Sequence, residues 1–133
     1  MAVPYPLVAS AEKILTEFLK RVEEIREDDW YLYKVSKAYV FGSYLSDRNR
    51  INDVDVAIEL VPKEKDRDTL EELNRYKAEF EMRGGRRLSF VEKMFWAKIE
   101  VVKFLKSRSR ISVHEIEDLS LDPRAKLIYE DKN

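Results

Sequence analysis

The chain has 133 residues, no cysteine and a single histidine, which excludes disulfides, thiolate chemistry and a metal site built from several imidazoles. With 25 basic and 26 acidic residues the net charge is −1, so composition does not predict a nucleic-acid-binding protein with a global basic surface. No apolar run reaches membrane-spanning length and the N-terminus shows no signal-peptide pattern. We therefore expect a single cytoplasmic domain over residues 1–133.

The first predicted element is an amphipathic helix from Ser10 to about Asp28. Residues 1–9 contain two prolines and predict an extended arm, after which Ser10 can cap the helix. Apolar side chains recur at helical spacing and predict packing against a sheet: Ala11, Ile14, Leu15, Phe18, Leu19, Val22 and Ile25. An aromatic connector, residues 30–33, follows and either packs at a rim or stacks on a base.

The next two elements are predicted strands, at residues 37–41 and 53–61. Side chains alternate along a strand, so Asp53 and Asp55 lie on one face and the valines beside them lie on the other. Two carboxylates held this close repel each other, and a hard cation such as Mg²⁺ relieves that repulsion. The pair is a candidate metal site; the alternative is a solvent-facing polar side of the sheet that holds no metal.

A Gly-Ser turn, Gly42-Ser43, ends the first of these strands. Glycine adopts backbone angles that other residues avoid, so backbone N–H groups and the serine hydroxyl can approach a phosphate closely. A phosphate clamp followed by a carboxylate pair suits nucleoside triphosphate chemistry. Between the two motifs, Arg48 and Arg50 belong either to a solvated turn or to a contact with phosphate.

The chain thus has, in order, a hydrophobic strand, Gly42-Ser43, nine further residues and Asp53-Val54-Asp55. This arrangement resembles the signature of the DNA polymerase beta superfamily of nucleotidyltransferases, especially the minimal nucleotidyltransferases of bacteria and archaea. The resemblance implies Mg²⁺-dependent transfer of an NMP from an NTP, ATP being favoured, to an acceptor hydroxyl, with release of pyrophosphate. It implies that Gly42 and Ser43 hold the triphosphate and that Asp53 and Asp55 ligate Mg²⁺. The acceptor would be a protein side chain, an RNA end or a small molecule.

The same resemblance implies an alternative of another class. The chain would be a catalytically weak or inactive nucleotidyltransferase-like binding module, such as the antitoxin partner of a helical toxin protein. A helical partner protein in the same genomic neighbourhood would favour this alternative.

Two helices are predicted at about 66–107, more than the smallest members of the resembled family need, and we interpret them as an insert that offers a docking surface, for example for a homodimer. The first has a capping box, Thr69 with Glu72 or Asp68 with Glu71, and ends at Gly84-Gly85. The second has the capping box Ser89 and Glu92 and an apolar stripe from which Trp96 is absent. The stripe is Val91, Met94, Phe95, Ile99, Val102 and Leu105. Trp96 is therefore expected at a domain edge or a dimer contact.

Basic residues gather at the ends of these helices. They are Arg83, Arg86 and Arg87 after the first helix, and residues 103–110 after the second. They favour either solvated helix ends, where positive charge suits the helix dipole, or an RNA contact.

The third predicted strand, residues 110–119, bears on catalysis. The resembled family supplies a third carboxylate here, but alternation places Ser112 and His114 on the face of Asp53 and Asp55. Histidine is a suitable general base near neutral pH and a poor Mg²⁺ ligand. Glu115 would turn toward the aspartates if a bulge shifted the strand by one residue.

Near the C-terminus, Asp122-Pro123 would begin a short helix, or residues 126–129 would add an edge strand. Taken together, the elements predict an α+β fold, a small mixed sheet with helices mainly on one face and the site on the other.

Overall fold

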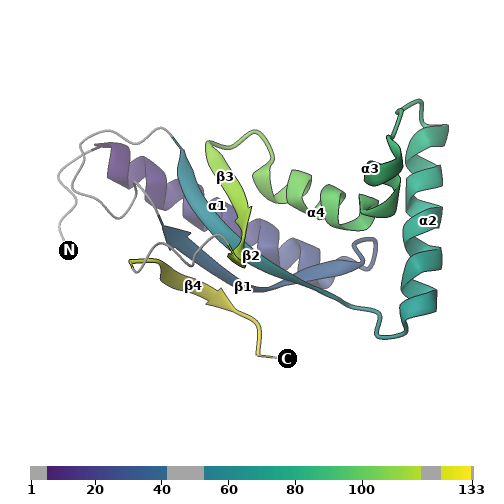
Figure 1. Ribbon diagram of the computed structural model, residues 1–133. Helices are drawn as coiled ribbons and strands as arrows, with labels where there is room; N and C mark the ends of the chain where they lie inside the picture. Colours follow the sequence, from purple (N-terminus) through teal and green to yellow (C-terminus); the bar gives the residue numbers. More distant parts are fainter. Residues whose placement is uncertain (1–5, 42–52, 118–123, 133) are drawn as a thin grey trace.

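The computed structural model describes residues 6–41, 53–117 and 124–132, and side chains from residue 11 onward (Figure 1). Its sheet has the strand order β3-β2-β1-β4, made by β1 (Tyr33–Phe41), β2 (Val54–Pro62), β3 (Ile111–Glu115) and β4 (Lys126–Glu130). Strand β1 is antiparallel to β2 and β4, whereas β3 is parallel to β2. This mixed sheet with helices confirms the predicted α+β class. None of the helices in the described ranges is long and apolar enough to cross a membrane.

One face of the sheet is covered by α1 (Pro6–Glu27) and α4 (Trp96–Lys106), which also contact each other. The predicted stripe of α1 is confirmed, because its core positions are buried against the valines of β1 and β2. The fully buried residues at this face include Phe18, Val22, Ile25, Val40, Val54, Val56, Val101, Leu105 and Ile111. The helix begins at Pro6 rather than at Ser10, so the extended arm predicted for residues 6–9 is wrong. Proline suits a first helical turn because its missing N–H would have no partner there.

The strand boundaries differ from the predicted ones by a few residues. Strand β1 begins at Tyr33, so one residue of the predicted aromatic connector belongs to the sheet. The pairing of β1 with β2 shifts between Val35 and Lys37, which is the signature of a bulge. Strand β3 ends at Glu115, earlier than predicted. The C-terminal edge strand is confirmed as β4, and the alternative helix start at residues 122–123 lies outside the described residues.

Between the parallel strands β2 and β3 the chain forms α2 (Arg67–Arg83), α3 (Phe90–Met94) and α4. Helices α2 and α3, which we call the hairpin, lie at one end of the molecule beyond the sheet (Figure 1). The cap predicted for α2 is wrong: Asp66 is the N-cap, and its carboxylate accepts hydrogen bonds from Thr69 N at 3.0 Å and Thr69 Oγ1 at 2.6 Å. The predicted stop at Gly84-Gly85 is confirmed, and Gly85 adopts φ 101°, a region that favours glycine.

The single helix predicted after Ser89 is interrupted at Phe95, with φ −117° and ψ 19°. Its capping box is confirmed, because Ser89 and Glu92 exchange both hydrogen bonds. The interruption has a long-range cause: Asn74 of α2 donates to the carbonyls of Lys93 and Met94 at 3.0 and 3.1 Å and accepts from Ala97 N at 2.8 Å. These bonds satisfy backbone groups that the helix would otherwise pair internally.

The interruption changes which side chains are buried. Trp96 is only 2% exposed and packs with Ala78 and Leu88 in a small second core, so its predicted place at an edge is wrong. Val91, Met94 and Phe95, which belong to the apolar stripe described from the sequence, are exposed. The apolar side chains before Phe95 and those after it therefore do not lie on one continuous helix face.

Candidate functional site

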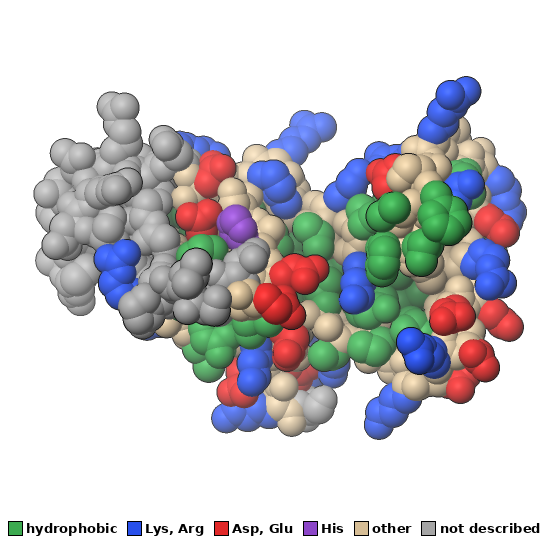
Figure 2. Space-filling view, in the orientation of Figure 1, with side chains coloured by type: hydrophobic (Ala, Val, Ile, Leu, Met, Phe, Trp, Pro, Cys, Tyr) green, Lys and Arg blue, Asp and Glu red, His purple; other side chains and the backbone are tan. Residues whose placement is uncertain are grey.

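The carboxylate pair lies where β2 begins, on the sheet face opposite α1 and α4. Val54 and Val56 are buried in the main core, and this fixes Asp55 on the other face. Asp53 is exposed just before the strand, and Asp55 is partly buried. Figure 2 shows acidic side chains beside the histidine in this part of the molecule.

Strand β3 brings Ser112 and His114 to the same face. The parallel pairing runs without a shift from Val54 opposite Ile111 to Ile58 opposite Glu115. Ser112 Oγ donates to Asp53 Oδ2 at 3.3 Å, and His114 Nε2 lies 3.3 Å from Asp55 Oδ1. Alternation along β3 had predicted this face for both side chains, and each one contacts an aspartate.

Phe41 closes one side of the site and was not among the predicted site residues. It pairs with Asp55 across β1 and β2, and its ring meets the His114 ring edge-on, with centroids 5.2 Å apart. An aromatic neighbour of this kind limits the orientations that an imidazole adopts. The signal was present in the sequence, since an antiparallel pair sets the last residue of β1 opposite the start of β2.

Glu115, the alternative to His114, lies on the other face of β3. It lines a pocket of about 290 Å³ with Ile58, Val113 and Lys98, and its neighbour His114 lines the same pocket. Since β3 pairs with β2 without a bulge, nothing turns Glu115 toward the aspartates.

The two aspartates have no lysine or arginine partner among the described residues. Within that part of the chain, their nearest partners are a hydroxyl and an imidazole at 3.3 Å. The described residues hold no cluster of three or more histidine or acidic side chains suited to a metal. Two carboxylates nevertheless suit Mg²⁺, which takes oxygen ligands and commonly keeps waters and substrate oxygens. Gly42, Ser43, Arg48 and Arg50 lie outside the described residues.

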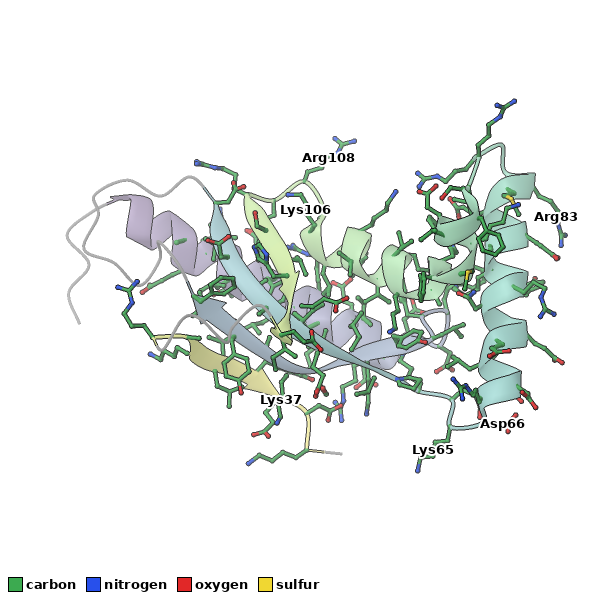
Figure 3. The ribbon with its side chains drawn as sticks, viewed as in Figure 1. Lys37, Lys65, Asp66, Arg83, Lys106 and Arg108 are labelled. Atoms are coloured by element: carbon green, nitrogen blue, oxygen red, sulfur yellow. The ribbon has the colours of Figure 1, made fainter. Side chains whose placement is uncertain are left out.

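The basic residues singled out in the sequence do not form one patch. Arg83 lies at the end of α2, whereas Lys106 and Arg108 lie at the turn between α4 and β3 (Figure 3). Arg86 is 3.5 Å from Glu81, and Lys106 Nζ donates to the Ile111 carbonyl at 2.8 Å. Local contacts therefore account for part of this charge.

Comparison with protein families gives a match over most of the chain. A family model described as "Nucleotidyltransferase domain" matches residues 19–121, which include both motifs and all of β3. Searches of curated proteins and of solved structures found no match.

Proposed function

Because the chain belongs to the nucleotidyltransferase-domain family of the DNA polymerase beta superfamily, we propose that it is an Mg²⁺-dependent enzyme that transfers an NMP from an NTP, preferably ATP, to an acceptor hydroxyl. The observation that carries the proposal is the pair Asp53 and Asp55 at the start of β2, with no lysine or arginine partner in the described chain. Such a pair has oxygen ligands and unbalanced negative charge to offer a divalent cation.

In this proposal Asp53 and Asp55 hold the metal, and Gly42 and Ser43 hold the triphosphate. The metal, when bound, neutralises charge that develops on the phosphate oxygens. The acceptor oxygen forms a bond to the α-phosphorus, the bond from that phosphorus to the β-phosphate oxygen breaks, and pyrophosphate leaves. His114, oriented by Asp55 and by the Phe41 ring, accepts the proton of the acceptor hydroxyl.

Isothermal calorimetry of each NTP with and without Mg²⁺ tests the binding part. We expect Mg²⁺-dependent binding to the wild type and to the matched control Asp68→Asn, which removes an exposed carboxylate on α2. In Asp53→Asn/Asp55→Asn, affinity should fall about 100-fold or more, because the metal ligands lose their charge. Equal binding by the double variant, or no binding by the folded wild type, would overturn the proposal.

A second candidate function is a catalytically weak binding module, such as the antitoxin partner of a helical toxin protein. It is favoured by one observation: the side chain of β3 that lies beside Asp55 on the site face is a histidine, where the resemblance to the family implies a carboxylate.

Two substitutions at one position separate the candidates. If His114 is the general base, His114→Gln should lower Mg²⁺-dependent pyrophosphate release by about 100-fold with NTP affinity retained, and His114→Asp should not exceed the wild type. If the histidine marks a lost carboxylate, the wild type should release almost no pyrophosphate with RNA, protein or small hydroxyl acceptors, and His114→Asp should raise the rate.

A further inference from the structure

Helix α2 carries a row of large apolar side chains that the protein leaves exposed. Leu73, Tyr76 and Phe80 are 37, 52 and 49% exposed. Their spacing of three and then four residues is that of a helix–helix seam. Trp30, 42% exposed, extends the row, because its ring meets Phe80 edge-on at 5.3 Å. We call these four residues the α2 stripe.

Trp30, at the end of the α2 stripe, is held in position by Lys77. Lys77 Nζ lies 3.3 Å from the centroid of the Trp30 ring, donates to the Trp30 carbonyl at 2.6 Å and pairs with Glu100 of α4 at 2.8 Å. Lys77 itself is buried. An aromatic group fixed in this way loses little conformational entropy when a partner covers it, which is typical of interface anchors.

The charges along α2 select the partner. Within α2, residues 67–74 contain three acidic residues and one arginine, whereas residues 75–83 contain two arginines and two glutamates besides the buried Lys77. A second α2 lying antiparallel would keep the two acidic halves apart and set each of them against the half of the other helix that carries Arg75 and Arg83. A two-fold axis perpendicular to a helix gives this antiparallel arrangement.

We propose that the α2 stripe is a homodimer interface in which the α2 helices of two copies pack antiparallel. Glu72 and Arg83 are both exposed and are separated by 11 residues, about three turns, so they lie on nearly the same side of the helix. With the two-fold axis near the middle of α2, Glu72 of each copy meets Arg83 of the other. Tyr76 then lies close to the axis.

The more exposed apolar side chains of α3 are a less suitable face for a second copy. Figure 2 shows hydrophobic side chains gathered over α3 and the neighbouring part of α2, and the exposed ones there include Phe90, Val91 and Met94. The charged residues that line the groove with Phe90 and Met94 are four basic ones, Arg67, Arg75, Lys93 and Lys98, and two acidic ones, Glu71 and Glu79. Two copies meeting through α3 would bring like charges together.

The proposed interface and the carboxylate pair lie at opposite ends of the molecule, because β2 begins far from α2 (Figure 1). Dimer formation is therefore independent of the proposed nucleotide site. Variants that separate the copies should bind nucleotide as the wild type does.

Sedimentation equilibrium of the full chain over a concentration series tests the dimer. The wild type should be dimeric well below 100 μM, a concentration at which any micromolar interface is largely filled. Glu72→Lys and Arg83→Glu should each raise the dissociation constant about tenfold, since each creates two repulsive pairs per dimer. An equimolar mixture of the two variants should recover wild-type affinity, because the lysine introduced at position 72 of one chain then faces the glutamate introduced at position 83 of the other.

The stripe itself is tested with a matched pair of variants. Tyr76→Ser should raise the dissociation constant at least tenfold, whereas Val91→Ser on α3 should leave it unchanged. Circular dichroism confirms that each variant is folded. Each of three results would overturn the proposal. The wild type could stay monomeric at about 100 μM, or the mixture of the two charge variants could fail to recover affinity. The third is a dimer that is lost in Val91→Ser but kept in Tyr76→Ser.

Discussion

The sheet with α1 and α4, which we call the sheet body, and the hairpin of α2 and α3 are stabilised by different means. In the sheet body, residues from two helices and three strands form one continuous apolar core. The hairpin packs on α4 through a small apolar core and through two polar side chains of α2: Asn74 bonds to the α3–α4 junction, and Lys77 bonds to Glu100 and to the Trp30 carbonyl. When an apolar contact is removed, the unfolding free energy falls roughly in proportion to the apolar area lost. When a buried polar group loses its partner, the unfolding free energy falls by the full desolvation cost of that group.

The two regions can be followed separately, because both tryptophans of the chain contact the hairpin. Trp96 lies in the small core, and Trp30 contacts Phe80 and Lys77. Tryptophan fluorescence therefore reports on the hairpin, while circular dichroism reports on all helices and strands. Unfolding followed by both signals shows whether the two regions unfold together.

The largest expected effect is that of Phe18→Ala in α1. Phe18 is fully buried in the main core, so the variant should lose about 3–5 kcal/mol of unfolding free energy. We expect both signals to shift together in urea, because the hairpin rests on α4, which belongs to that core. The exposed neighbour Lys13 is the control, and Lys13→Ala should change stability by less than about 0.5 kcal/mol. An unchanged fluorescence transition in Phe18→Ala would show that the hairpin unfolds independently.

Lys77→Met should have the next largest effect, about 3 kcal/mol, because it leaves Glu100 buried without its partner. Burial is the main cause both of the lowered pKa of Lys77 and of the raised pKa of Glu100, as expected for a desolvated pair. Lys77→Met/Glu100→Leu should recover most of the loss, since neither charge remains. If the double variant were as unstable as the single one, the contacts with Trp30 rather than the ion pair would carry the stability.

Asn74→Ala should cost about 2 kcal/mol, because three backbone groups at the α3–α4 junction lose their partner. The fluorescence transition should shift most, since Trp96 begins α4 at this junction. Arg75→Ala, at the exposed neighbouring position, should change stability by less than about 0.5 kcal/mol. Equal effects of the two substitutions would argue against a role of Asn74 in the interruption at Phe95.

The same division explains what the sequence predicts well. The apolar spacing of α1 and the alternation in β2 and β3 depend on near neighbours, so they predict the main core and the face shared by Asp53, Asp55 and His114. The burial of Lys77 and Trp96 depends on contacts made by Glu100 and Asn74, more than 20 residues away along the chain. Residue type alone predicts an exposed lysine, and a continuous helical pattern predicts an exposed Trp96. Long-range polar contacts override both expectations.

The smallest expected effect concerns Tyr129, on the edge strand β4 of the sheet body. Burial, with the nearby carboxylates of Glu23 and Asp131, raises the pKa of Tyr129 on β4 to about 12. A raised pKa in the folded state contributes stability that is fully present below the ordinary tyrosine pKa of about 10 and is lost as pH rises toward about 12. Burial also raises the pKa of Tyr31 and Tyr33, so wild-type stability should fall in this range for more than one reason.

Tyr129→Phe isolates the contribution of β4. The difference in unfolding free energy between the wild type and this variant should be constant up to about pH 9 and should shrink between about pH 10 and 12. Urea unfolding at a series of pH values measures it, with circular dichroism as the signal. A difference that stays constant to pH 12 would mean that the Tyr129 phenol is as well solvated in the folded protein as in the unfolded chain. The edge of the sheet body would then depend on Asp131, which pairs with Lys34 at 2.9 Å, rather than on burial of the phenol.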